Sequence, residues 1–144
     1  MDWDEVREAG SATGFITYVG TRSADGTPHV AAASPGFGDE GVVWFATRAS
    51  SKKARNLRAD PRVAFHWPVA TGSGPGELVA NGSATIHEGE EARHGLWEAG
   101  VVPFDLSRFF GSPDNPELVF VETKLDKARL MGPDFVARRW KRSD

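Results

Sequence analysis

The sequence contains no cysteine, which excludes disulfide bonds, zinc–thiolate sites, iron–sulfur clusters and cysteine nucleophiles. No stretch approaches the roughly 20 apolar residues of a membrane-spanning helix. The first ten residues, MDWDEVREAG, are acidic and lack an apolar run, so a secretory signal peptide is not expected. These absences predict a soluble cytoplasmic protein.

An excess of positive charge is also lacking, because the formal net charge is −3 over 144 residues. Proteins that bind nucleic acids generally present a net positive face, so we expect no nucleic-acid partner. The basic residues are nevertheless clustered, in 48–62 and 138–142, which favours a local anion site. No repeat or long linker divides the chain, and we expect one domain over 1–144.

Several motifs that carry chemistry are missing. There is no P-loop, no GxGxxG fingerprint and no GxSxG nucleophile elbow. The four histidines are spaced as surface or barrel-mouth residues, so no metal site is expected. No buried carboxylate pair stands out, and no catalytic residue can be named. If the protein is an enzyme, a cofactor is expected to supply its reactive group.

The segment from Val42 to Phe65 is the most informative part of the sequence. Its start, 42–47, is apolar, aromatic or β-branched and predicts a buried strand. Ser50 and Ser51 offer an N-cap for a helix over 52–59, which Pro61 ends at the preceding residue. A second strand is expected over 63–67. The unit is therefore strand, short helix, strand.

Two lysines lie where a helix least favours cations. Lys52 and Lys53 fall in the first helical turn, where free N–H groups already make the potential positive. An anion between them would remove this conflict. Together with nearby hydroxyl groups they predict a phosphate site made of Thr47, Ser50, Ser51, Lys52 and Lys53. The same residues also suit a solvated basic face with an ordinary serine cap.

The N-terminal third predicts a helix over 2–9, strands over 15–22 and 29–34, and a turn over 35–41. With the strand from Val42, the three strands are expected to form an antiparallel meander. The second strand ends in Ala31, Ala32, Ala33 and Ser34, side chains that are small for a β element. Small residues admit either a ligand or a closely packed helix.

The rest of the chain predicts a flexible loop over 68–76, a long strand over 77–87 and a helix over 88–99 ending at Gly100. A second short helix over 103–110 would be anchored by Leu106, Phe109 and Phe110. The last strands are expected over 118–123, 128–131 and 135–140. Six or seven strands with short helices indicate a mainly β fold, a small closed or nearly closed antiparallel barrel.

The segment WFATRASSKKARNLRADPRVAF resembles the flavin-binding segment of the pyridoxamine 5′-phosphate oxidase-like, FMN-binding split-barrel superfamily. The resemblance extends to DGTPHV in the first hairpin, to Asn81–Ala84 and to the Arg-Trp end of the last strand. It implies that Thr47, Ser51, Lys52 and Lys53 hold the FMN phosphate. It further implies that the strand ending in Ala32, Ala33 and Ser34 backs the isoalloxazine ring.

Members of this superfamily are usually homodimers with the flavin at the subunit interface. The resemblance therefore implies that the partner's C-terminal region, around 131–140, closes the site. Trp67, Trp97 and Trp140 are expected to be core or interface anchors. Trp140, which lies among basic residues, is the one assigned to the dimer interface or the cofactor edge.

Departures from the oxidases make oxidation of pyridoxamine phosphate itself unexpected. Ala46 replaces a tyrosine, Met131 replaces a tryptophan, and the C-terminal Arg-x-His motif is missing. The chain looks more like the general-stress-protein and flavin/deazaflavin branch. Its expected function is hydride transfer between FMN and an unknown small molecule. Dependence on the deazaflavin F-420, or a non-catalytic flavin- or haem-binding role, are the alternatives.

Overall fold

A computed structural model describes residues 1–14 and 16–143. Its twelve elements are α1 (Trp3–Ser11), β1 (Thr17–Arg22), β2 (Pro28–Ala33), β3 (Gly36–Phe37), β4 (Val42–Arg48), α2 (Lys52–Ala59), β5 (Arg62–Thr71), β6 (Gly74–His87), α3 (Glu90–Ala99), α4 (Ser107–Phe110), β7 (Leu118–Met131) and β8 (Ala137–Lys141). All strand pairs are antiparallel.

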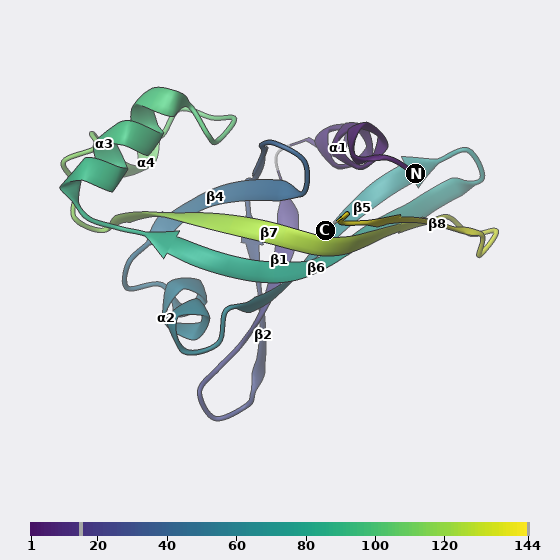
Figure 1. Ribbon diagram of the computed structural model, residues 1–144, viewed down its shortest axis with the longest axis horizontal. Helices are drawn as coiled ribbons and strands as arrows, with labels where there is room; N and C mark the ends of the chain where they lie inside the picture. Colours follow the sequence, from purple (N-terminus) through teal and green to yellow (C-terminus); the bar gives the residue numbers. More distant parts are fainter. Residues whose placement is uncertain (15, 144) are drawn as a thin grey trace.

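The strands form one sheet in the order β2-β1-β5-β6-β7-β4-β3, and β8 also pairs with β7. The long strands β6 and β7 run through its middle, and α2 lies below them with the β1–β2 hairpin beside it (Figure 1). The β2 and β3 ends of this order do not pair with each other, so the sheet stays open. The predicted mainly β split-barrel fold is confirmed, with eight strands instead of six or seven.

The core lies inside the curved sheet and combines aliphatic side chains with a group of packed aromatic rings. Phe65 stacks on Trp67, with ring centroids 5.3 Å apart. Phe65 and Phe45 form a T-shaped pair with ring centroids 6.2 Å apart. All three side chains are fully buried, as the alternation of apolar residues along β4 and β5 requires. The α1 helix closes one end through Trp3 and Val6, and Trp3 packs on Trp140.

The predicted meander of three strands is wrong. β1 and β2 form the expected hairpin, but β4 pairs with β7 and with the two-residue β3 that lies inside the predicted turn. Pairing with β7 allows β4 to bury Val43, Phe45 and Thr47 along one face. The expected strand over 15–22 is observed as Thr17–Arg22, and Phe15 lies outside the described residues.

The predicted loop over 68–76 is also wrong, because β5 and β6 continue through it as a hairpin that pairs Thr71 with Gly74. β1 pairs only with Ala64–His66 of β5, so Pro68 lies on a free edge where its missing N–H costs no ladder bond. The two strands expected over 118–131 are one strand, β7. A register shift opposite Asn81 and Gly82 accommodates its extra residue, Asp126, as a bulge.

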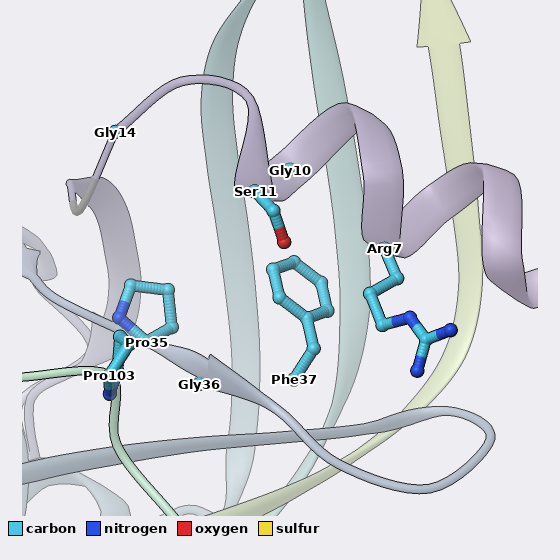
Figure 2. Close-up of a pocket in the computed structure, with 8 residues that line it drawn as sticks. All are labelled: Arg7, Gly10, Ser11, Gly14, Pro35, Gly36, Phe37 and Pro103. Atoms are coloured by element: carbon cyan, nitrogen blue, oxygen red, sulfur yellow. The ribbon is translucent and has the colours of Figure 1, made fainter.

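The Pro35–Phe37 segment packs between helix α1 and the segment 101–103, which is distant in the sequence. Figure 2 shows the Phe37 ring pointing at α1 beside Gly10 and Ser11, with Pro103 close to Pro35. A Cβ atom on Gly10 would lie 2.4 Å from the ring of Phe37. One on Gly36 would lie 2.1 Å from the carbonyl oxygen of Val101. Both glycines are therefore required for close packing around this segment.

Candidate functional site

A cleft of about 670 Å³ opens where β2, β4 and α2 meet the segment 104–110. One wall comes from the ends of the two strands and the first turn of the helix. The other comes from the short helix α4 and the residues before it. The lining residues are Ala32, Ala33, Ser34, Ala46, Thr47, Arg48, Ser51, Lys53, Phe104, Asp105, Arg108, Phe109 and Phe110. This volume is typical of a small-molecule site.

The hydroxyl groups at the start of α2 are held in a defined arrangement. Ser51 is the N-cap, and its Oγ accepts a hydrogen bond from the Ala54 backbone N–H at 3.1 Å. Thr47, the next-to-last residue of β4, donates its Oγ1–H to the same Oγ at 3.1 Å. Ser51 remains able to donate its own hydroxyl proton to an acceptor in the cleft. The strand–helix junction therefore offers donors suited to an oxyanion.

Lys53 crosses from α2 to β2. Its Nζ donates to the carbonyl oxygen of Ala32 at 2.9 Å, and among the described residues it has no carboxylate partner. Burial lowers the pKa of this amine below its usual value of 10.5. A half-buried ammonium group with one neutral acceptor would be stabilised by an anion.

The other charges in the cleft are mostly positive. Arg48 and Arg108 line it together with a single carboxylate, Asp105. The Asp105 carboxylate accepts hydrogen bonds from the hydroxyl and the backbone N–H of Ser107, at 2.6 and 3.0 Å, and these hydrogen bonds lower its pKa. The cleft therefore carries three cationic side chains against one anion, although the whole chain is negative.

Six of the nine site residues expected from the sequence line this one cleft. They are Thr47, Ser51, Lys53, Ala32, Ala33 and Ser34. The alanines leave room at the wall formed by β2, so a flat ligand could approach the backbone closely. The structure thus places the start of α2 and the small-residue end of β2 on the same cleft, two features that only the family resemblance had connected.

Three expected site residues lie elsewhere. Ser50 donates its hydroxyl to Glu117 at 2.6 Å, which lowers the pKa of that carboxyl. Lys52 lines a different open cleft with Asp25 and Arg55. Trp140 is 5% exposed and packs against Trp3 inside its own chain. Their proposed roles at a cofactor stay predictions.

The aromatic wall over 104–110 was missed as part of the site. Leu106 is buried as expected, but Phe109 is 63% exposed, so its predicted role as a core anchor is wrong. Leu106, the residue before the four-residue α4, is buried in a cluster with Leu118 and Phe120 of β7. Phe109 is left facing outward as a lining residue of the cleft. The three phenylalanines within the seven residues 104–110 were the sequence feature that could have indicated an aromatic wall of a binding site.

One group of residues could hold a metal ion. Glu90, His94 and Asp114 place one ligand atom each within 4.8 Å of one another, and His94 Nε2 lies 2.8 Å from Asp114 Oδ1. All three are exposed and none lines the cleft. The expectation that no metal is bound stays a prediction.

A family model described as pyridoxamine 5′-phosphate oxidase matches residues 4–132. The chain belongs to the pyridoxamine 5′-phosphate oxidase family. Comparison with curated protein sequences gave no match. The match covers every residue of the cleft, so the family assignment includes the candidate site.

Solved structures with the same fold include several relatives of this family. General Stress Protein 26 from Bacillus anthracis has 20% identity and a TM-score of 0.65, over 96% of this chain and 95% of its own. A heme-binding protein from Mycobacterium smegmatis has 14% identity and a TM-score of 0.75, over 98% of this chain and 58% of its own. An F420 reductase has 20% identity and a TM-score of 0.59, over 88% of this chain and 94% of its own. At these identities the likeness concerns the fold.

Proposed function

We propose that the protein is an FMN-binding oxidoreductase of the pyridoxamine 5′-phosphate oxidase family, acting on a small molecule other than pyridoxamine phosphate. The observation that carries the proposal is the pairing of Lys53 and Ser51 with the small-residue strand in one cleft of about 670 Å³. Lys53 and Ser51 can donate hydrogen bonds to a phosphate, and the small side chains of the strand leave room for a flat ring. When bound, the flavin would supply hydride transfer.

The residues of the chain fit this cofactor. Lys53 and the free hydroxyl proton of Ser51 would hold the phosphate, and Thr47, which donates its own hydroxyl proton to Ser51 Oγ, would orient that hydroxyl. Ala32 and Ala33 would let the ring lie against β2. Two strands and a helix fix this corner, so its donors need little reorganisation on binding. Asp105 is the one carboxylate among the described lining residues, and the hydrogen bonds that lower its pKa keep it an ionised acceptor and not a proton donor to a substrate.

The cofactor is proposed to lie at the interface of a homodimer. Tyr18 and Val30 are 43% and 68% exposed. They lie on the sheet face that carries Ala32, because Tyr18 pairs with Ala32 and Val30 with Gly20. An apolar patch continuous with the cleft suits a second copy of the chain. In the region 131–140, the exposed Phe135 and Val136 are better placed to contact a partner than the buried Trp140.

An F-420-dependent reductase is the second candidate, favoured by the structural similarity to an F420 reductase. The two cofactors present phosphate to the same kind of site. Haem binding is less well supported by this cleft. None of its described lining residues is a histidine, cysteine, methionine or tyrosine, the usual axial ligands of haem iron.

The deciding experiment is a visible absorbance spectrum of the purified protein, followed by titration with FMN and with F-420. We expect a flavin spectrum and saturation at about one FMN per chain. Tighter binding of F-420 would select the second candidate. Failure to bind either cofactor would overturn both. None of the helices in the described part of the chain is long and apolar enough to cross a membrane.

The affinity for FMN should depend on pH through Lys53. Burial lowers the pKa of its amine below 10.5 in the free protein. As the pH rises through this lowered pKa, the ammonium loses its proton and FMN affinity should fall. The Lys53→Arg variant should keep its affinity over the same range, because guanidinium stays charged. An equal loss of FMN affinity with rising pH in the wild type and in Lys53→Arg would contradict the assignment of Lys53 to the phosphate.

A further inference from the structure

The wall over 104–110 has a feature that phosphate binding does not explain, namely an exposed aromatic side chain that lines the cleft. Phe109 is 63% exposed although its segment is well anchored. Val102 and Leu106 are 7% and 6% exposed and pack in a cluster with Leu118 and Phe120. The exposure of Phe109 is therefore a property of a fixed surface and not of a loose loop.

The ring of Phe109 is also held in place. Phe104 meets it edge-on, with the ring centroids 5.4 Å apart and an interplanar angle of 88°. In an edge-to-face pair one ring leaves much of its surface free for another contact. Both residues line the cleft. The wall thus presents a pre-oriented aromatic surface across the cleft from the strand of small residues.

We propose that Phe109, supported by Phe104, is a stacking residue that binds the planar tricyclic ring of the cofactor, separately from the phosphate corner at Lys53. This inference rests on the proposed function. Aromatic side chains bind flat heterocycles by stacking without needing specific hydrogen bonds. The site then has two independent parts, a cationic corner that recognises phosphate and an aromatic wall that recognises the ring.

The two parts can be separated with FMN and riboflavin, which share the ring and differ in the phosphate. Dissociation constants for both would be measured by flavin fluorescence in the wild type, in Phe109→Ala and in Lys53→Ala. Phe109→Ala should weaken both ligands by the same factor, about tenfold. Lys53→Ala should weaken FMN alone.

Matched variants distinguish stacking from simple burial. Phe109→Tyr should retain affinity, whereas Phe109→Leu, which is apolar but not planar, should lose nearly as much as Phe109→Ala. Because Phe109 is exposed, its variants should unfold at the wild-type temperature, which thermal denaturation checks.

The possible failures can be distinguished. FMN binding that is unchanged in Phe109→Ala would overturn the stacking role and leave the proposed function standing. A loss confined to FMN would assign Phe109 to the phosphate and overturn the two-part site. If the wild type bound neither FMN nor riboflavin, the proposed flavin function would fall together with this inference.

Discussion

Replacing Lys53 by alanine is expected to weaken FMN binding by about 10- to 100-fold, because a hydrogen bond to a charged group contributes about 1.5–3 kcal/mol. The Lys53 ammonium is half-buried and bonds only to the carbonyl oxygen of Ala32 among the described residues. Its charge is therefore available to a phosphate and poorly screened by water. Isothermal titration calorimetry with FMN would measure the change.

Lys52→Ala is the matched control for this variant. Lys52 is the adjacent residue in the same helical turn and has the same charge, but it lines a separate cleft with Asp25 and Arg55. Its removal should change FMN affinity by less than about threefold, as expected for an exposed charge outside the cleft. Equal losses in both variants would indicate general electrostatic attraction, and no loss in Lys53→Ala would show that the phosphate lies elsewhere.

Gly36→Ala is expected to destabilise the fold and disturb the aromatic wall together. The added Cβ would lie 2.1 Å from the carbonyl oxygen of Val101, a backbone atom that cannot rotate away. Such overpacking costs about 1–3 kcal/mol of the free energy of unfolding. Since Val101 leads into the segment 104–110, its displacement should also move the wall. Urea unfolding would measure the first effect and FMN titration the second.

Gly72→Ala is the corresponding control. A Cβ at Gly72, in the β5–β6 turn, would meet no atom within 4 Å, and the residue does not have a positive φ angle. Its unfolding free energy should stay within about 0.5 kcal/mol of the wild type. A similar loss in both variants would show that the Val101 contact is not the cause.

Local patterns in the sequence predicted the secondary structure around the candidate site correctly. Ser51 is the N-cap of α2, the helix spans Lys52–Ala59, and Pro61 follows its end. Gly100 ends α3 with a φ angle of 66°, as the sequence indicated. Each of these features depends on neighbours within a few residues, where capping and turn preferences act.

Features that depend on distant residues were not predictable in the same way. The pairing of β4 with β7 joins residues that lie 70 to 82 positions apart in the sequence, and an alternating strand carries no information about its partner. Phe109 was expected in the core because an aromatic residue usually is buried, and only the anchoring of Leu106 on β7 shows that Phe109 faces the cleft. The side chains of Ser50 and Lys52 lie outside the cleft that Ser51 and Lys53 line, because Ser50 bonds to Glu117 and Lys52 lines the cleft beside Asp25. These neighbours come from distant parts of the chain, so local sequence patterns could not separate the two pairs.

The position of β7 next to β4 has a consequence for the order of folding. β4 carries Thr47 and Arg48 of the cleft, yet its main partner is Leu118–Lys124. During synthesis, a chain that has emerged only as far as α3 offers β4, among the described residues, no strand to pair with except the two-residue β3. The phosphate corner would then be attached to an unpaired strand. Binding competence should therefore arise late, after β7 has been made, and the many non-local contacts of the sheet should make folding slow for a chain of this size.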